Sequence, residues 1–409
     1  MLGAVSSCRA SANTPSGRVL RVKGHGVSTK GAKGDLLATI LIVTPDTLSD
    51  ASKKIIDAGN TTSIFDPVLC ELADRVLPEH TADLFRRHRH RLAAAQQRVL
   101  VQAMTFEGDA AGLAVAEAIG HSGAADRRVL VDAYTRHVIN DTFLALSRKP
   151  AIHAEARTTA AMFDRLLRQG AGVRVTNPIG RNPLRYALRN HKKLLVIDDV
   201  AWIGGINFSD HNFAWHDMMV RIEHRGLADW LAGEFDRDWH GLGGSAATEI
   251  AGAGLLSMDG ADNPAGFAPL LAAFAGARQS LEVVSAYPTF PFVDAMGAAA
   301  RAGARVTLYT PRPNNKPIIR DYLLGVAEAA GIEIRLTPMM THAKAALIDG
   351  TALVVGSSNF DFVSYRANAE YVAVLRDAAL IDAFREHVLF PLQAGSTAPL
   401  PGSMRRMSP

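Results

Sequence analysis

The sequence predicts an α/β protein made of two similar halves, each a mixed, mostly parallel sheet flanked by helices. Two observations predict this class. Short apolar runs with strand character alternate with longer runs of helical character, which favours a sheet covered by helices. The same order of elements also occurs twice along the chain, and a similar short motif follows it each time. A repeated order of this kind indicates an internal duplication.

The individual elements follow from the apolar patterns. The first half is expected to contain helices at 110–119 and 162–169 and strands at 98–104, 128–131 and 173–176. The second half is expected to contain helices at 291–302 and 321–330 and strands at 281–285, 304–309 and 332–336. In each half a pair of strands then carries the repeated motif, and a further strand follows, at 218–222 and at 371–375. The apolar run 36–43 is read as one more buried strand.

Composition divides the chain into four segments. Residues 1–34 are rich in Gly, Ser, Lys and Arg and are predicted to form a flexible basic tail. The N-terminal half is assigned to 35–245 and the C-terminal half to 255–393, with the boundary near the Gly- and Ala-rich stretch 241–254. Residues 394–409 are predicted to be a second flexible tail.

The bulk composition narrows the class of protein. The 409 residues are 48% hydrophobic and 21% charged, as in ordinary globular proteins, and the net charge of +4 is compatible with an anionic partner. The only cysteines are Cys8 and Cys70, so a disulfide framework or a structural zinc site is not expected, and a reducing compartment is. No run of about 18 apolar residues occurs, so a protein that acts on lipid would have to reach the bilayer peripherally.

The pattern His-x-Lys-x-x-x-x-Asp occurs twice, 151 positions apart (342 − 191), and each copy precedes a turn of small residues that ends in Asn. The first copy comprises His191, Lys193, Asp198 and Asn207. The second comprises His342, Lys344, Asp349 and Asn359. A single copy would be read as an edge position of a strand, but two copies in matching contexts indicate a site.

The chemistry of these residue types suits phosphate ester cleavage without a metal. Side chains two apart on a strand share a face, so each His and Lys should project together. A neutral imidazole can act as a nucleophile and a protonated one can donate a proton to a leaving alkoxide. Lysine and asparagine can stabilise charge on phosphate oxygens. Asp198 lies seven positions after His191, an odd offset, so it and Asp349 are predicted to be structural.

A histidine nucleophile usually needs a carboxylate on its far nitrogen. Asp217 lies ten residues after Asn207 (217 − 207), and Glu370 lies eleven after Asn359 (370 − 359). Each acid opens a hydrophobic strand. We therefore expect each half to provide its own orienting acid.

Two further features of the sequence allow two interpretations each. The basic run 85–91 fits a solvated helix face or a contact with anionic lipid or nucleic acid. The aromatic residues Tyr287, Phe290 and Phe292 could pack in the core or line an acyl-chain channel. The remaining histidines are taken as ordinary residues, namely His80, His121, His153, His216 and His224.

Three blocks of sequence resemble the phospholipase D superfamily, and within it bacterial cardiolipin synthase-like proteins. They are RNHKKLLVIDDVAWIGGINFSD (189–210), WHDMMVRIE (215–223) and THAKAALIDGTALVVGSSNFDFVSYRANAE (341–370). The resemblance implies two halves related by a pseudo-twofold axis with one site between them. It also implies a metal-free, two-step displacement without a cofactor, in which His191 is the nucleophile and His342 the general acid and base. Lys193, Lys344, Asn207 and Asn359 would hold the phosphate.

The resemblance leads us to expect a phospholipase D or phosphatidyltransferase that acts on phospholipids or another phosphodiester. A nuclease or other non-lipid phosphodiesterase of the same superfamily is the alternative, and a non-catalytic scaffold is a third reading. We expect a cytoplasmic protein with peripheral membrane contact, and nucleic acid is the less favoured partner. The sequence leaves open hydrolysis or transfer, the reverse assignment of the two histidines, and the oligomeric state.

Overall fold

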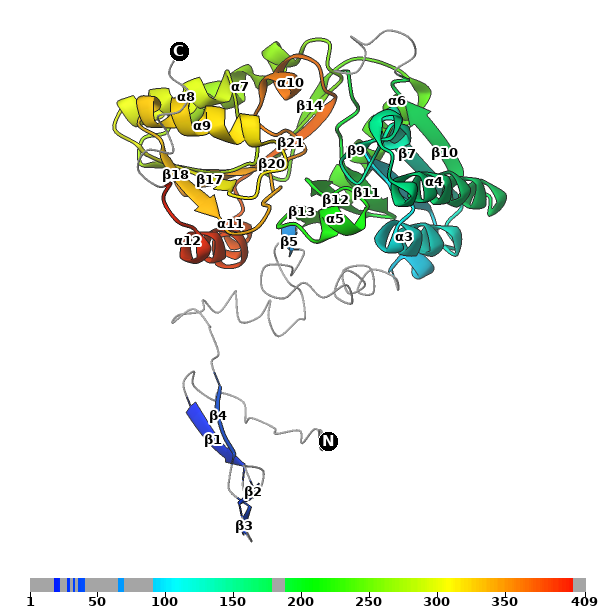
Figure 1. Ribbon diagram of the computed structural model, residues 1–409, viewed down its shortest axis with the longest axis horizontal. Coiled ribbons are helices and arrows are strands. Elements are labelled where there is room, and N and C mark those ends of the chain that lie inside the picture. Colours follow the sequence, from blue (N-terminus) through cyan, green and yellow to red (C-terminus); the bar gives the residue numbers. More distant parts are fainter. Residues whose placement is uncertain are drawn as a thin grey trace. The chain divides into compact units, whose positions relative to one another are not determined.

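The computed structural model describes residues 91–178 and 188–399, together with the backbone of five strands nearer the N-terminus. The chain divides into two compact units, Met1–Thr62 and Ser63–Pro409. Both copies of the motif lie in the second unit (Figure 1). Residues 35–62, which the sequence assigned to the N-terminal half, fall in the first unit.

The first sheet of the second unit has seven strands. Three neighbouring strands pair in parallel, and the others pair antiparallel. Their spatial order is β10 (Gly172–Thr176), β7 (Asp126–Asp132), β6 (Arg98–Ala103), β11 (Leu194–Ile197), β12 (Val200–Gly204), β13 (Met218–Ile222) and β5 (Phe65–Leu69).

The second sheet has eight strands and repeats this plan. Its order is β18 (Glu333–Thr337), β17 (Arg305–Pro311), β16 (Ser280–Val284), β19 (Ala345–Ile348), β20 (Ala352–Gly356), β21 (Glu370–Leu375), β15 (Ala253–Met258) and β14 (Ala246–Ile250). Again three strands at one side are parallel and the rest are antiparallel. The predicted α/β class with two similar halves is confirmed, and the parallel pairing is confined to those three strands of each sheet.

The two sheets share a central core. In β11, Leu194 and Val196 belong to a cluster that contains residues of both sheets, whereas Leu195 and Ile197 belong to a cluster of the first half alone. Such alternation is expected because successive side chains of a strand point to opposite faces. Strands β12 and β20 are in contact where the sheets meet (Figure 1).

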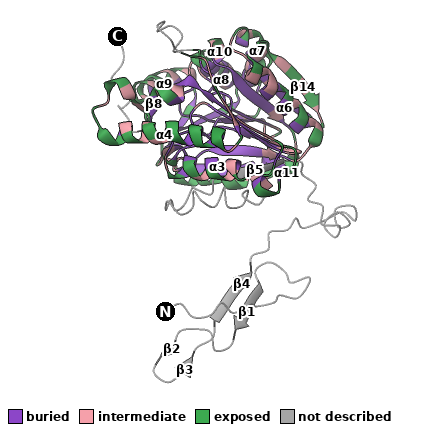
Figure 2. Ribbon diagram, turned by 90° about the vertical axis from the view of Figure 1, so that its right-hand side faces the viewer, coloured by how far each residue is buried: buried purple, intermediate pink, exposed green. Residues whose placement is uncertain are grey.

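The helices are divided between this central core and two outer cores. Two helices cover the outer face of the first sheet, α3 (Ala110–Gly120) and α4 (Pro150–Arg168). Three cover that of the second sheet, namely α7 (Asn263–Ala275), α8 (Phe292–Arg301) and α9 (Pro317–Ala330). Helices α6 (Arg225–His240) and α11 (Ala378–Phe384) pack into the central core. The buried apolar residues thus form three cores, and Figure 2 colours the buried parts of the ribbon purple.

Several boundaries differ from the sequence predictions. Strand β1 (Arg18–Val22) of the predicted tail pairs with β4 (Leu36–Ile40), and the short strands β2 (Ser28–Thr29) and β3 (Ala32–Lys33) also pair. Strand β14 lies in the predicted linker, because its backbone completes the edge of the second sheet beside β15. At the other end, Thr397 exchanges backbone hydrogen bonds with Leu336, so the C-terminal segment is anchored there. Both cysteines and residues 85–90 lie outside the described residues.

In the part of the chain that the structure describes, no helix has the length and apolar character needed to span a membrane.

Candidate active site

Each His-x-Lys segment lies just before a strand, β11 or β19, so the prediction that His and Lys lie within the strand is wrong. The backbone N–H of His191 donates to the carbonyl of Ala369 over 2.9 Å, and that of His342 donates to the carbonyl of His216 over 2.7 Å. Both bonds cross between the two halves. Each motif is therefore held by the segment that leads into β21 or β13 of the opposite half.

The orienting acids consequently cross over. His191 Nδ1 lies 3.1 Å from both carboxylate oxygens of Glu370, and His342 Nδ1 lies 2.6 Å from Asp217 Oδ2. The expectation that each half supplies its own acid is wrong, because the residue before each acid pairs with the other half's motif. In both pairs the carboxylate accepts a hydrogen bond from Nδ1–H, which leaves Nε2 for a substrate.

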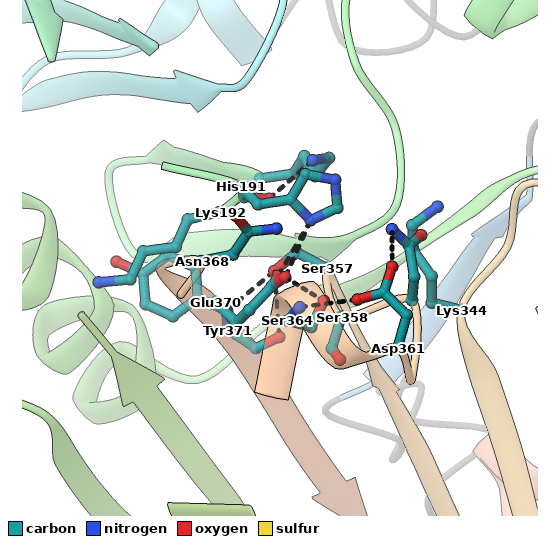
Figure 3. Close-up of polar contacts among 12 residues, drawn as sticks. His191, Lys192, Lys344, Ser357, Ser358, Asp361, Ser364, Asn368, Glu370 and Tyr371 are labelled. Atoms are coloured by element: carbon teal, nitrogen blue, oxygen red, sulfur yellow. Dashed lines mark hydrogen bonds and ion pairs between the residues drawn. The ribbon is translucent and has the colours of Figure 1, made fainter. Parts of the chain in front are cut away.

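Two serines support the acid beneath His191. The hydroxyl of Ser364 donates to Glu370 Oε1 over 2.6 Å, and Ser357 donates to Oε2 (Figure 3). Burial alone would raise the pKa of Glu370, but His191, Lys193 and Ser357 outweigh it and lower that pKa below its usual value. Glu370 is therefore a carboxylate that can stabilise a charged imidazole.

The acid beneath His342 has a different neighbour. An ideal Cβ on Gly205 would lie 2.2 Å from Asp217 Oδ1, so glycine is required where the second half has Ser357. The preceding glycines, Gly204 and Gly356, leave room for the backbone of β13 and of β21. The small-residue turns thus admit neighbouring protein atoms. The charges of Lys344 and His342 lower the pKa of Asp217 against the effect of burial.

Both motif lysines are buried beside the histidines. Lys193 Nζ donates to the carbonyl of His191 over 2.7 Å, and Lys344 donates to that of His342. Burial lowers the pKa of Lys193 to about 7 and that of Lys344 to about 8. Neither side chain is among those that line the cavity over the histidines, so their charge acts from behind the histidines.

Burial also keeps both imidazoles neutral. It lowers the pKa of His342 to about 3, with a further contribution from Lys344 and opposition from Asp217. It lowers the pKa of His191 in the same direction, against Glu370. An anion bound beside these groups would favour their protonated forms and raise both pKa values.

A cavity of about 500 Å³ lies over the two histidines. Asn207 and Asn359 also line it, as the motif predicts. Asn207 Oδ1 accepts the backbone N–H of Thr105, whereas Asn359 Oδ1 has no hydrogen-bond partner among the described residues. The cavity is further lined by Met104, Glu107, Tyr134, Val138, Asp141, Phe143, Arg189, His211, Asn212, Trp215, Tyr287, Asn315, Lys316, Asp361, Val363 and Asn368.

The three aromatic residues considered in the sequence occupy three different environments. Tyr287 lines the cavity, with its ring centroid 6.2 Å from that of His342. Phe290 is exposed, and Phe292 is fully buried in the outer core of the second half. Trp215 also packs on His342, with centroids 5.2 Å apart. His342 is therefore in contact with two aromatic rings as well as with its acid.

The two motif aspartates have structural roles. Asp198 accepts the backbone N–H groups of Gln96, Gln97 and Arg98 just before β6. Asp349 does the same just before β16, with Arg278, Gln279 and Ser280 as its donors. Both aspartates have positive φ angles, 50° and 48°, in the turns after β11 and β19. They bond to strand ends and not to the histidines.

Sequence reasoning missed several cavity residues. Glu107 and Lys316 follow β6 and β17, and side chains just past the carboxyl ends of strands are where α/β sites gather. Burial raises the pKa of Glu107 to about 9, so at pH 7 it is a neutral carboxyl. Arg189, two residues before the first motif histidine, pairs with the buried Asp132 over 2.7 Å. His216, taken as ordinary, joins the halves through its backbone.

A family model matches most of the chain on either side of this site. The model of the cardiolipin synthase, PLD-like domain family matches residues 89–239 and 270–389. The chain belongs to this family. The two matched segments contain the two copies of the motif, one each.

Individual relatives are more distant. The chain is 26% identical over 232 residues to cardiolipin synthase 1 of Staphylococcus epidermidis, an alignment that covers 48% of this chain and 46% of the relative. It is 27% identical over 273 residues to a cardiolipin synthase of Listeria monocytogenes, covering 57% and 56%. The aligned region thus spans about half the length of these relatives. A phosphatidylserine synthase from Haemophilus influenzae Rd KW20 has a similar fold, with a TM-score of 0.62 at 14% identity over 78% of this chain and 86% of that one.

Proposed function

We propose that this protein is a phospholipase D-type phosphodiesterase or phosphatidyltransferase that acts on phospholipids through a phosphohistidine intermediate. The observation that carries the proposal is the pair of histidines on one cavity, each held at Nδ1 by a buried acid. Two neutral imidazoles with free Nε2 atoms supply both a nucleophile and a proton carrier for one phosphodiester.

The reaction proceeds in two displacements. In the first, Nε2 of His191 forms a bond to phosphorus as the bond to the leaving oxygen breaks, and His342 gives its proton to that oxygen. In the second, His342 takes a proton from water or an alcohol, whose oxygen bonds to phosphorus and displaces His191. The charge of the bound diester raises the pKa of His342 far enough for it to carry the proton of the first step. Lys193, Lys344 and the two asparagines stabilise charge on the phosphate oxygens.

The lining of the cavity favours a phospholipid over nucleic acid. Apolar side chains such as Val138, Phe143 and Val363 are mixed with polar ones, and the acidic residues Asp141 and Asp361 are also present. Apolar lining suits the acyl and glycerol parts of a phospholipid better than the charged backbone of a nucleic acid. The names of the relatives, cardiolipin synthase and phosphatidylserine synthase, point in the same direction.

The test is incubation of the purified protein with phosphatidylglycerol vesicles, with and without EDTA. We expect cardiolipin from transfer, or phosphatidic acid from hydrolysis, and we expect both conditions to give it. Single-stranded and duplex DNA, assayed in parallel, should remain intact. DNA cleavage without phospholipid turnover would replace this proposal with the nuclease, and a strict metal requirement would contradict the two-histidine mechanism.

Variants separate the two histidines from the remainder of the protein. His191→Ala and His342→Ala should each reduce turnover by several orders of magnitude, because each removes a group that forms or breaks bonds. His121→Ala changes an exposed histidine away from the cavity and should retain full activity. Acid-labile, base-stable phosphate should label the wild-type chain during turnover and should be absent from His191→Ala. Labelling of His191→Ala but not of His342→Ala would reverse the two roles.

A further inference from the structure

A first exposed apolar segment lies beside the cavity in the N-terminal half. It runs from Phe143, which lines the cavity, to Lys149. Leu146, in the short turn of helix after β9 (Thr142–Phe143), is 82% exposed. The segment also carries Arg148 and contains no acidic residue. A large apolar side chain is thus presented to solvent among positive charges.

A second segment with the same character lies in the C-terminal half. Lys316 lines the cavity just before α9, and Ile318 in the first turn of that helix is 78% exposed. Tyr322 is exposed one turn later. The stretch 312–322 contains three basic residues and one acidic residue, Asp321, which pairs with Arg320 over 2.8 Å.

The second segment is joined to the turn just before the first by Asn315 and Asp141, which both line the cavity. Asn315, next to Lys316, donates from Nδ2 to Asp141 Oδ2 over 2.9 Å, and Asp141 lies in the turn between β8 (Val138–Ile139) and β9. Figure 2 labels β8 and α9 on the same side of the molecule. Two further exposed aromatic residues lie by the cavity, since Phe362 stands between the lining residues Asp361 and Val363 and contacts Phe290 with ring centroids 6.3 Å apart.

We propose that this surface seats the protein on a lipid bilayer that contains anionic lipid, with the cavity mouth against the headgroups. We call it the rim, defined as Phe143, Leu146, Arg148, Lys149, Lys316, Ile318, Tyr322, Phe290 and Phe362. The inference rests on the proposed function, because binding to a bilayer serves the reaction only if the substrate is a lipid.

The side-chain composition of the rim favours an anionic bilayer as its binding partner. Exposed apolar side chains around one cavity mark an interaction site, because soluble proteins seldom expose them in groups. Apolar side chains mixed with Lys and Arg fit the interface of an anionic bilayer, where the chains enter the acyl boundary and the cations remain among the headgroups. A substrate whose phosphodiester lies at headgroup depth would then reach the histidines without leaving the membrane.

The experiment measures sedimentation of the full chain with vesicles of phosphatidylcholine alone and of phosphatidylcholine with phosphatidylglycerol. We expect binding to the anionic vesicles that weakens with salt. Leu146→Asp and Ile318→Asp should each weaken it by roughly tenfold or more. Leu242→Asp is the matched control, because Leu242 is 58% exposed but belongs to neither segment. Equal binding by the wild type and both rim variants would overturn the proposal.

A second measurement distinguishes the rim from the catalytic machinery. Neither Leu146 nor Ile318 lines the cavity, so both rim variants should cleave a short-chain phosphatidylglycerol below its critical micelle concentration at the wild-type rate. Their turnover on vesicles should fall with their binding. Equal loss on both substrates would show a folding defect and count against the rim. A change of oligomeric state in the variants, without a change in vesicle binding, would assign the surface to a protein partner. Vesicle binding without turnover of any phospholipid would refute the proposed function alone.

Discussion

At the scale of single residues, the two histidines, the two motif lysines and the two orienting acids all have pKa values below their ordinary ones. Burial lowers the pKa of His191 and of His342, and it brings the pKa of Lys193 to about 7. The neutral nucleophile therefore persists at pH values where a free histidine would be protonated. The positive charge of the site is lost at pH values where a free lysine would keep it.

The profile of kcat/KM against pH should consequently be bell-shaped, with a basic limb close to pH 7 to 8. This limb reports the loss of protons from Lys193 and Lys344 in the free enzyme, whose pKa values are about 7 and about 8. The kcat profile should have its basic limb at higher pH, because a bound phosphodiester anion raises both pKa values. Steady-state kinetics from pH 5 to 10 would measure both limbs, about five pH units in all. Identical basic limbs in the two profiles would contradict the assignment.

Gly205 offers a sharper test of the acid beneath His342. In Gly205→Ala the new Cβ would be 2.2 Å from Asp217 Oδ1, so the carboxylate must move from His342. We expect kcat to fall by roughly 10–100-fold, as for other displaced orienting acids. Gly233→Ala is the control, because a Cβ there meets nothing within 4 Å and Gly233 lies within α6. That change should leave kcat unaltered and add about 0.5–1 kcal/mol to the free energy of unfolding.

The identity of the site residues could be predicted from the sequence, but their pairing could not. His191, His342, Asp217 and Glu370 are visible as a repeated pattern. Distance along the chain favours an acid of the same half, and the structure places the acid of the other half at Nδ1. The crossing depends on backbone bonds between segments more than 100 residues apart, for which a single sequence carries no local signal.

At the scale of elements, the motif aspartates bind strands together. Asp198 connects the turn after β11 to the start of β6 through three backbone N–H groups. Asp198→Ala should lower the free energy of unfolding by about 1–3 kcal/mol, because three backbone N–H groups, two exposed and one half-buried, lose a charged acceptor. Chemical denaturation would measure this loss.

The control for that change is Asp198→Asn, which keeps one acceptor oxygen and a residue type that tolerates the positive φ of 50°. It should recover part of the lost stability. At a temperature where the alanine variant is still folded, both variants should retain the wild-type kcat. A kcat loss comparable with that of His191→Ala would mean that Asp198 acts in the chemistry after all.

Elements with strong apolar periodicity were predictable, and those fixed by edge pairing were not. Strands β6, β11 and β21 are buried runs that the sequence shows directly. Strand β14 has a half-exposed pattern and a composition typical of a linker, and it is ordered by pairing with β15. Helix α4 begins at Pro150, twelve residues before its predicted start. The prediction missed its first turns because they bury little apart from Ile152 and so lack a clear apolar periodicity.

At the scale of the whole molecule, Lys192 joins the two halves. Its ammonium donates to Asp238 of α6 and to Ser257 of β15, and it lies 4.7 Å from the ring centroid of Tyr371. The side chain is fully buried. The Lys192 ammonium therefore contacts residues of both halves at the central core.

Lys192→Met should lower the free energy of unfolding by about 3–5 kcal/mol, because it leaves Asp238 largely buried without its cation. The double variant Lys192→Met with Asp238→Asn removes both charges and should recover much of that loss. Calorimetry of the three proteins would measure it, and residues 91–399 should still unfold in one transition. Equal stability of the single and double variants would show that the ion pair contributes nothing.

The duplication was predictable because it is a property of order along the chain. The shared central core was not, because each strand's apolar face is compatible with several partners. Only the folded arrangement shows that the inner faces of the two sheets cover each other.

The crossing of the acids determines which histidine is affected by a substitution in either half. A substitution at Asp217 alters the N-terminal half, yet the histidine that it disables, His342, belongs to the other. A substitution at Glu370 disables His191 in the same reciprocal way. Selection on each histidine therefore acts on both halves, because its orienting acid lies in the opposite one.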